Sequence, residues 1–366
     1  MKKMCLILSA TFALSQFIAC TKMDFPFFAG DITEVLSNSE ASKVMQPLAD
    51  FRQLSDTLTE VFSVNTSIKD GQIVTRHGTT IQLPTDGFVN AKKQSVSGTI
   101  RLYVRELRRP SEMLLSDKCA QNTEGGILES FGEFCLVART PNGEPLQLAD
   151  GKVVSVAAPI WAKNDPAGVP MWAADTTILR TKVGLNSNGE KVSVVKTIGV
   201  SRGTVWQRNG EKATVNTTLH QLEFDIKRLN EWHNCDILST YEGEKATILC
   251  YFTQNYYPSV SADDFASQPS AVFFKPKNLN SLVKFYSPIL NPTAGKTGFH
   301  SYEKSVPVGI EGKLVALSCT DGRYFIEIRD VTIPQPAAGQ TLVPFSMNPK
   351  EVNKSAFLTA VRSLDE

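Results

Sequence analysis

Hydrophobic and polar residues alternate with a period of two from about residue 62 to about residue 345. The stretch GTIRLYVREL places Ile100, Leu102 and Val104 on one face and Arg101 and Arg105 on the other. Such alternation is typical of a β-strand with one buried face. The pattern therefore predicts a strand whose arginines face solvent.

Turn-forming dipeptides separate these alternating stretches. Asn-Gly and Asp-Gly accept the positive φ angles that tight hairpin turns require. Many short strands with frequent turn signals favour antiparallel sheets over a doubly wound sheet. We therefore predict a mainly β fold with two or more antiparallel β-sandwich domains. The predicted turns are Asn142-Gly143, Asp150-Gly151, Asn188-Gly189, Asn209-Gly210 and Asp321-Gly322.

Helical periodicity is predicted near both ends of the chain. Apolar residues recur near the 3.6-residue period from Gln46 to Val61, which predicts a short N-terminal helix. In NPKEVNKSAFLTAVRSL, Asn348 has the position of an N-cap, Pro349 of the first helical residue and Glu351 of the third. A C-terminal helix is expected to follow.

Composition changes divide the chain into segments. The stretch WAKNDPAGVPMWAADTT contains prolines and a glycine that interrupt the alternation, so one β domain is expected to end near Ile160. The predicted segments are a signal peptide at 1–19, a tether and helix at 20–65, a β-sandwich at 66–160, a connecting β segment at 161–221, a second β-sandwich at 222–345 and a C-terminal helix at 346–366.

The N-terminus has the order of a secretory signal. Lys2 and Lys3 precede the apolar run MCLILSATFAL, and the signal closes on FIAC at Cys20. An apolar run of about a dozen residues is too short to cross the roughly 30 Å hydrocarbon core as a helix. FIAC resembles the lipobox of bacterial lipoproteins, which implies cleavage before Cys20 and acylation of its thiol and amino group. Two alternatives stay open: a secreted protein cleaved nearby, or a buried apolar helix.

Lipidation of Cys20 predicts a location as well as a modification. Several acyl chains on one residue anchor a protein stably, whereas one chain binds reversibly. Thr21 follows Cys20, instead of the Asp that marks retention in the inner membrane of enteric-type bacteria. This resemblance favours the cell outer membrane, on either its periplasmic or its surface face. No later window reaches 18 consecutive apolar residues.

The charge balance bears on the partners of the chain, and the cysteine content bears on its disulfides. Lys plus Arg number 38 and Asp plus Glu number 37, so no overall field recruits nucleic acid. Besides Cys5 and the lipidated Cys20, five cysteines remain, an odd number that cannot all pair within the chain. We predict no cofactor and no metal. Buried free thiols and one or two disulfides are both open; the pairs considered are Cys119 with Cys135, and Cys250 with Cys235 or Cys319.

Two short motifs have the residue types of catalytic or metal sites. GVSRG matches the nucleophile elbow around Ser201, but the β-branched, turn-rich TVWQRNGEKATV that follows does not predict the helix that the elbow needs. EWHNCD places His233 and Cys235 on one face of a strand, where they could supply only two of the three or four zinc ligands. Both motifs are more simply read as structural, so we predict no catalytic residue. A hydrolase would need His220, His233 or His300 beside Ser201.

Aromatic residues near turns are the remaining candidates for recognition. Exposed rings supply a large, rigid contact area at low entropic cost, and they stack on sugars or grip peptides. The alternative is that the same rings fill a β-sandwich core or wedge domains together. The candidate binding residues are Tyr251, Tyr256, Tyr257, Trp161 and Trp172.

Three stretches resemble a recurrent domain of Bacteroidetes-type envelope lipoproteins related to the ZU5 β-sandwich. They are HGTTIQLPTDGFVNAKKQSVSGTIRLYVRELRRPSEML with GGILESFGEFCLVARTPNGEPLQLADGKVVSVAAP, and FDIKRLNEWHNCD, within residues 75–160 and 222–330. The resemblance implies a ZU5-like β-sandwich and no established ligand or activity. Some eukaryotic relatives cleave themselves at His-Phe-Ser; here the order is Phe299-His300-Ser301. The resemblance therefore gives self-cleavage no support.

These observations together predict a lipid-anchored, non-catalytic envelope protein with a structural or adhesive role. Its partners would be the membrane, through the lipid anchor, and envelope proteins or glycans. The alternative is an accessory lipoprotein that binds polysaccharide or peptide for a transporter or secretion complex. A serine hydrolase is a third reading.

Overall fold

The structure is a computed structural model of the chain, and its first 53 residues lie outside the described part. Cys20, the predicted signal and most of the predicted N-terminal helix therefore lie outside it as well. Within the described residues, no helix is long and apolar enough to cross a membrane. The described residues are 54–55, 57–68, 71–161, 166–257, 269–290 and 292–366.

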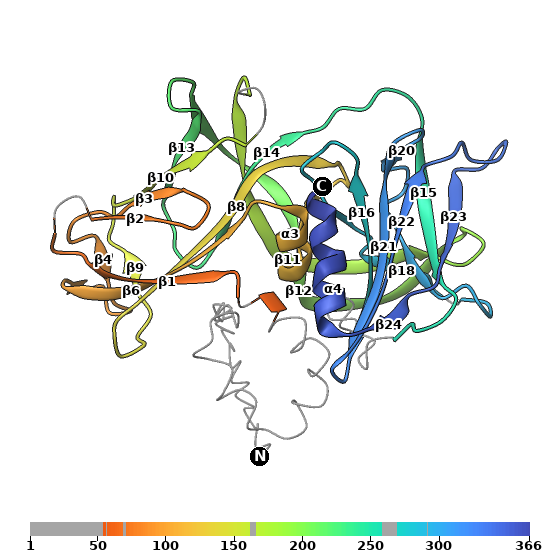
Figure 1. The fold of residues 1–366 in the computed structure, drawn as a ribbon, viewed down its shortest axis with the longest axis horizontal. Coiled ribbons are helices and arrows are strands. Elements are labelled where there is room, and N and C mark those ends of the chain that lie inside the picture. The colour runs from red at the N-terminus through yellow and green to blue at the C-terminus, as the bar shows by residue number, and fades with distance from the viewer. Residues whose placement is uncertain (1–53, 56, 69–70, 162–165, 258–268, 291) are drawn as a thin grey trace, which may run out of the picture.

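Strands dominate the described chain, which confirms the predicted mainly β fold (Figure 1). The largest sheet in the described part has 11 strands, and ten of them follow a single path. In chain order its strands are β1 (Thr59–Asn65), β2 (Gln72–Val74), β3 (Thr80–Gln82), β6 (Thr99–Leu107), β7 (Lys118–Asn122), β8 (Leu128–Arg139), β10 (Val154–Pro159), β11 (Val169–Leu185), β12 (Lys191–Asn216), β13 (Gln221–Ile226) and β14 (Trp232–Leu238).

The large sheet curls until its two end strands meet. Its path runs β1-β6-β8-β14-β11-β12-β13-β10-β3-β2, so β1 and β2 are its ends. The backbone N–H of Arg76, just after β2, donates to the Glu60 carboxylate of β1 at 3.0 Å. Curling encloses an apolar core that includes Phe88, Phe134 and Leu102. A small three-stranded sheet of described residues adds Phe88 to this core: β4 (Phe88–Val89), β5 (Ser95–Val96) and β9 (Gln147–Leu148).

Two further sheets form the second half of the molecule. In the described residues each has five strands, and they share an apolar core that includes Ile248, Phe274 and Phe299. One sheet comprises β15 (Lys245–Phe252), β18 (Ser287–Pro288), β19 (Gly298–His300), β20 (Val306–Pro307) and β23 (Leu342–Met347). The other comprises β16 (Ser270–Pro276), β17 (Val283–Lys284), β21 (Glu311–Thr320), β22 (Arg323–Thr332) and β24 (Lys350–Val352).

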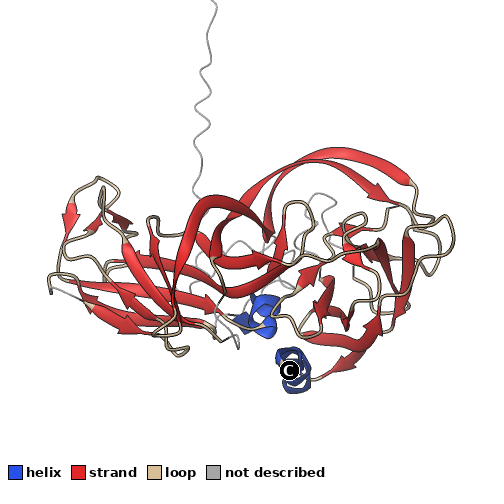
Figure 2. Cartoon of the chain, turned by 90° about the horizontal axis from the view of Figure 1, so that it is seen from above, coloured by secondary structure: helices blue, strands red, loops and turns tan. Residues whose placement is uncertain are grey.

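A third apolar core joins the two halves. It contains the large-sheet tryptophans Trp172, Trp206 and Trp232 together with Phe273 of β16 and Phe357. Helices lie at this junction, as Figure 2 shows from above. They are α3 (Pro110–Ser116), α4 (Lys354–Arg362) and the short 3-10 helix η2 (Ser363–Asp365).

The long hairpin of β11 and β12 also connects the halves, reaching from the large sheet over the second half (Figure 1). At its tip, the backbone N–H of Leu185 donates to His300 Nε2 at 3.2 Å, and Asn186 forms a parallel bridge with Leu290. Leu185 also packs with Tyr251 and Ile289 in a small core of its own. The tip is therefore a packed contact between the halves.

Several sequence predictions of turns are confirmed, and one is wrong. Asp321-Gly322 joins β21 to β22 with φ angles of 52° and 71°, and Asn188-Gly189 lies in the turn between β11 and β12. Asn209-Gly210 instead lies inside β12, beside a register shift opposite Pro170 and Trp172. The positive φ of Gly210 there serves an irregularity within a strand pair rather than a hairpin turn.

The helix boundaries also need correction. Thr59 to Val61 belong to β1, so the predicted N-terminal helix does not extend to Val61. A C-terminal helix is confirmed, but its N-cap is Asn353, whose side chain accepts a hydrogen bond from Ala356 N at 2.9 Å. Asn348 and Pro349 precede a further strand, β24, which pairs with β22. The Asn348–Glu351 pattern therefore leads into a strand, and the helix starts at Asn353, five residues later.

One face assignment was wrong. Ile100, Leu102 and Val104 are fully buried and Arg101 is exposed, as the alternation predicts. Arg105, however, is buried, because its guanidinium donates to Thr59 Oγ1 where β1 covers this end of β6.

Strands β13 and β14, from the segment predicted as a second sandwich, pair with β10 and β8 in the large sheet.

Candidate functional site

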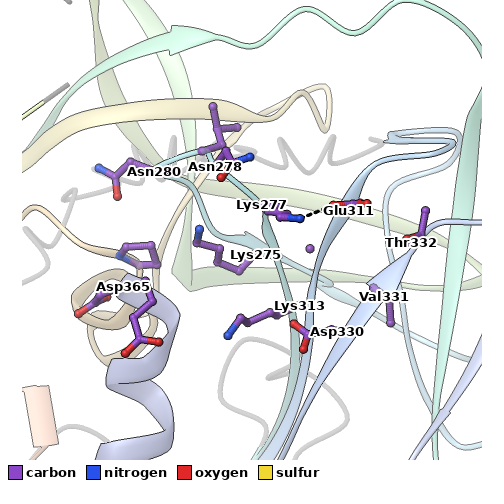
Figure 3. Close-up of a pocket in the computed structure, with 14 residues that line it drawn as sticks. Lys275, Lys277, Asn278, Asn280, Glu311, Lys313, Asp330, Val331, Thr332 and Asp365 are labelled. Carbon is purple, nitrogen blue, oxygen red and sulfur yellow. Dashed lines mark hydrogen bonds and ion pairs between the residues drawn. The ribbon is translucent and has the colours of Figure 1, made fainter. Parts of the chain in front are cut away.

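A groove of about 760 Å³ lies where the two halves meet the C-terminus (Figure 3). Its floor is formed by β16, β21 and β22, and its wall by the start of α3 and by η2. Most of the side chains that line it are polar or charged. The lining residues are Pro110, Lys275, Lys277, Asn278, Leu279, Asn280, Glu311, Gly312, Lys313, Asp330, Val331, Thr332, Asp365 and Glu366.

Strand register brings the charges on the floor into one row. Lys275 of β16 is the cross-strand partner of Lys313 of β21, and Lys313 is in turn the partner of Asp330 of β22. Directly opposed residues in an antiparallel pair point to the same face, with Cβ atoms about 4.5–5.5 Å apart. Register therefore places the two lysine side chains next to each other on one face, with the carboxylate of Asp330 beyond Lys313.

Lys275 has an unusual environment for a lysine. Only 7% of its surface is exposed, and no hydrogen bond or ion pair to it or to Lys313 exists among the described residues. Burial lowers the pKa of Lys275, the Lys313 ammonium lowers it further, and Asp365 acts in the opposite direction. Figure 3 shows both lysines extending from the sheet toward the side of the groove where Asp365 lies.

Asp365 is held in place by the other wall. Its carboxylate accepts from Ser111 N at 2.9 Å and from Ser111 Oγ at 2.8 Å, so η2 is fixed to the first turn of α3. Burial raises the pKa of Asp365, although the hydrogen bonds from Ser111 lower it. The wall thus presents a carboxyl group whose position does not depend on a ligand.

The mouth of the groove carries an exposed ion pair. Lys277 Nζ lies 2.6 Å from Glu311 Oε2, and both side chains are more than half exposed. The hydrogen bond from Lys277 lowers the pKa of Glu311, and the same bond raises that of Lys277. Of the three lysines that line the groove, Lys277 is therefore matched by a carboxylate, while Lys275 and Lys313 present their charge to the space between the walls.

This arrangement is suited to a small ligand that carries a carboxylate. Ammonium groups make strong, charge-assisted hydrogen bonds to carboxylates. Asn278, Asn280, Asp330 and Thr332 add amide, carboxylate and hydroxyl groups that can bond to ligand hydroxyls. The volume lies within the range of about 300–1,000 Å³ that small-molecule sites occupy.

None of the aromatic residues proposed from the sequence lines this groove. Tyr251 is only 6% exposed and packs against the tip of the β11–β12 hairpin, and Trp172 is 3% exposed in the core between the halves. Their assignment as exposed recognition residues is therefore corrected: both are core residues. The Tyr256 ring packs edge-on against Phe252 and tilted against Phe299, with ring centroids 5.4 and 5.9 Å apart.

Tyr257 and Trp161 lie nearer the surface. The Tyr257 ring packs 5.5 Å from that of Phe325. Trp161 is 47% exposed, and the guanidinium of Arg108 lies 4.8 Å from its ring centroid. The His77 ring meets the Trp161 ring edge-on at 5.3 Å. Trp161 and Tyr257 therefore contact side chains away from the groove lining.

The catalytic and metal motifs are not assembled into sites. Ser201 lies within β12, which continues to Asn216, so the strand-to-helix turn of a nucleophile elbow is absent at this described position. His233 is buried with Nε2 3.1 Å from Arg228 O, and burial lowers its pKa. Among the described residues, no group of three His, Cys, Asp or Glu side chains could hold a metal ion.

The cysteines of the described chain are all free and buried. Burial raises the pKa of Cys135 to about 12 and that of Cys119 well above its usual value. Thiols with raised pKa values are poor nucleophiles and poor metal ligands. The disulfide pairs considered from the sequence are therefore not formed: Cys119, Cys135, Cys235 and Cys250 are buried free thiols, and Cys319 is buried without a disulfide.

Sequence reasoning missed the lysines of the groove. The signal that could have found them is the register of two strands: AVFFKPK and EGKLVAL each place a lysine at the end of a run of apolar residues. Their pairing, which lies 38 residues apart for Lys275 and Lys313, is set by tertiary structure. The role of Asp365 was even harder to predict from the sequence, because its position depends on how the C-terminus docks on α3.

No family model, no curated protein and no solved structure matches the chain.

Proposed function

We propose that the protein is an accessory lipoprotein of the cell outer membrane that binds an acidic sugar in the groove of Lys275 and Lys313. The observation that carries this proposal is the pair of adjacent ammonium groups, which have no ion-pair partner among the described residues. Two unmatched like charges side by side disfavour each other, so an anionic ligand between them gains from both. In this proposal the protein acts by binding and releases its ligand unchanged.

The rest of the lining supports a sugar as the anionic ligand. Sugar hydroxyls are both donors and acceptors, and the amides of Asn278 and Asn280 with the carboxylate of Asp330 supply both kinds of partner. Asn280 is itself fixed, because its Nδ2 donates to Arg108 O and Ser130 O at 3.0 and 2.7 Å. A pre-organised polar lining reduces the entropy lost on binding.

The membrane anchor rests on the sequence. The charged start, the apolar run and the small-residue end at Cys20 support export and lipidation. Acylation at Cys20 would leave the groove in the aqueous envelope, where acidic glycans and the proteins that transport them are the expected partners. The balanced charge of the chain supports partners other than nucleic acid.

A finer description of the fold belongs to the same proposal. The two five-stranded sheets of the second half share one apolar core, which supports a β-sandwich there. Residues 66–160 are proposed as the ZU5-like part, on the strength of the sequence resemblance alone. Because β13 and β14 complete the large sheet, the two proposed domains would be interlocked rather than joined by a simple linker.

Binding is tested by calorimetry with the methyl glycoside of galacturonic acid. Replacing Lys313 by Met is expected to weaken binding by about tenfold or more, since one charge-assisted bond is lost. Lys350→Met is the matched control, because Lys350 is an exposed lysine on β24 of the same sheet, away from the groove lining. Equal binding by all three proteins, or none by the native chain, would overturn the ligand proposal and leave the structural or adhesive role.

The anchor has its own test in cells. Cys20→Ser is expected to move the protein from the outer-membrane fraction to the soluble fraction, since no acyl chain could be attached. Mass spectrometry of the native mature protein should show an acylated N-terminal cysteine. An ordinary free N-terminus together with unchanged fractionation of the variant would contradict lipidation.

A further inference from the structure

We propose that Lys275 captures the reducing-end aldehyde of the acidic sugar as an imine, while Lys313 holds the carboxylate at the other end of the sugar unit. This inference rests on the proposed function, because it uses the same groove and the same ligand class. It adds a covalent step to binding, and it assigns different roles to two neighbouring lysines.

The geometry distinguishes Lys275 from an ordinary surface lysine. It is 7% exposed yet lines the groove, so its amine is reached from the groove rather than from the open surface. Its cross-strand neighbour is the like-charged Lys313. A lysine that is desolvated and placed next to another cation holds its proton less tightly and becomes a nucleophile.

The charged groups that face Lys275 have opposing effects on its pKa. Lys313 of β21 disfavours the ammonium form, and Asp365 of η2 favours it; Asp330 of β22 lies beyond Lys313 in the row. Burial is the largest influence, and the pKa of Lys275 is lowered overall. Lys313 would hold the carboxylate of the sugar through a charge-assisted hydrogen bond.

The covalent step balances without any further reactant. The lone pair of neutral Lys275 Nζ forms a bond to the aldehyde carbon, and the carbonyl oxygen becomes a hydroxyl. Loss of that hydroxyl as water leaves a carbon–nitrogen double bond. Both hydrogens of the departing water come from the amine, so no oxidant or reductant is consumed, and hydrolysis returns the free sugar.

Lys277 provides an internal reference for this chemistry. It is two residues from Lys275, lies in the same groove and is far more exposed. Its hydrogen bond to Glu311 raises its pKa, in the opposite direction to Lys275. If accessibility alone decided reactivity, Lys277 would react first; if the deprotonated fraction decides it, Lys275 reacts first.

The test is reductive trapping followed by peptide mapping. The native chain is incubated with galacturonic acid and cyanoborohydride, which reduces an imine to a stable amine, and labelling is compared at Lys275 and Lys277. Labelling at Lys275 is expected to exceed that at Lys277 by about tenfold or more, and the excess should grow as the pH is lowered from 9 to 7. Lys275→Arg keeps the charge and should abolish the label at this position, whereas Lys277→Arg should leave Lys275 labelling unchanged.

A second ligand separates failure of this inference from failure of the proposed function. The methyl glycoside of galacturonic acid keeps the carboxylate but has no aldehyde, so it should compete with trapping while forming no adduct. Binding of both sugars without preferential label at Lys275 would overturn the imine and leave the binding function standing. Absence of binding by both sugars would overturn the proposed function itself.

Discussion

The two halves of the molecule handle charge in opposite ways. The large sheet buries charged side chains within its walls: Arg105, Glu106, Arg108 and Glu133 are all less than 4% exposed. The paired five-stranded sheets enclose a core of apolar side chains, and Lys275, Lys277 and Lys313 at one end of them line the groove. The contrast shows that the same strand pattern can hold charge as an internal fastening or along an open groove, depending on which partners tertiary structure supplies.

The internal fastening is most complete around Glu106. Its carboxylate accepts from the hydroxyls of Thr75 at 2.5 Å and Thr79 at 2.6 Å, and Arg108 Nη1 lies 3.7 Å from it. Arg108 also donates to the carbonyl oxygen of Pro159. These contacts tie the β2–β3 hairpin, β6 and the end of β10 together across the seam where the large sheet closes.

The largest effect is therefore expected from breaking this fastening. Arg108→Met should lower the free energy of unfolding by about 3–5 kcal/mol, because it leaves the Glu106 charge buried without its cation. Urea denaturation at neutral pH measures the change. Arg101→Met, on the exposed face of β6, the strand that Arg108 directly follows, is the matched control and should change little. A loss below about 1 kcal/mol for Arg108→Met would show that the hydroxyls alone satisfy Glu106.

A second, opposite effect is expected at Glu133. This carboxyl group is fully buried, and neither of its oxygens has a hydrogen-bond partner among the described residues. Burial raises the pKa of Glu133 well above its usual value, nearby Asp236 raises it further, and Lys118 opposes the shift. Glu133→Gln should stabilise the protein at pH 7 by about 1–3 kcal/mol, because an amide is neutral at every pH.

The stability gained by Glu133→Gln is expected to depend on pH. Folded Glu133 keeps its proton to a higher pH than the unfolded chain does, so native stability falls as the pH rises above the carboxyl's ordinary pKa. The gain from Glu133→Gln should therefore be largest at neutral pH and disappear near pH 4. Denaturation midpoints from pH 4 to pH 8 would test this, and a gain that does not change with pH would contradict a buried proton.

The same contrast explains what the sequence could and could not predict. Periodicity and turn dipeptides predicted the strands and the Asp321-Gly322 hairpin, because these depend on neighbouring residues. The burial of Arg105 was missed, because it depends on β1, which lies 46 residues away at Thr59. The groove was missed for a related reason: Lys275, Lys313 and Asp365 meet only through strand pairing and C-terminal docking.

A smaller effect is expected at the C-terminal helix, which packs between the two halves through Phe357 and Val361. Asn353→Ala removes the side chain that accepts from Ala356 N, leaving one backbone donor at the helix start without this partner. The expected loss is about 0.5–2 kcal/mol of unfolding free energy. Asn348→Ala is the matched control, because the sequence predicted Asn348 as the N-cap but it precedes strand β24. A larger loss of unfolding free energy for Asn348→Ala than for Asn353→Ala would contradict a helix start at Asn353.

The smallest effect is expected at the exposed pair of Lys277 and Glu311. Their charges are close, at 2.6 Å, but both side chains are well exposed, so water and salt screen the attraction, and holding two long side chains in one geometry costs entropy. Lys277→Met should leave the denaturation midpoint unchanged within error, at low and high salt alike. A clear loss of stability would show that this pair fastens the groove as Arg108 and Glu106 fasten the seam, and the division between internal and displayed charge would then fail at this position.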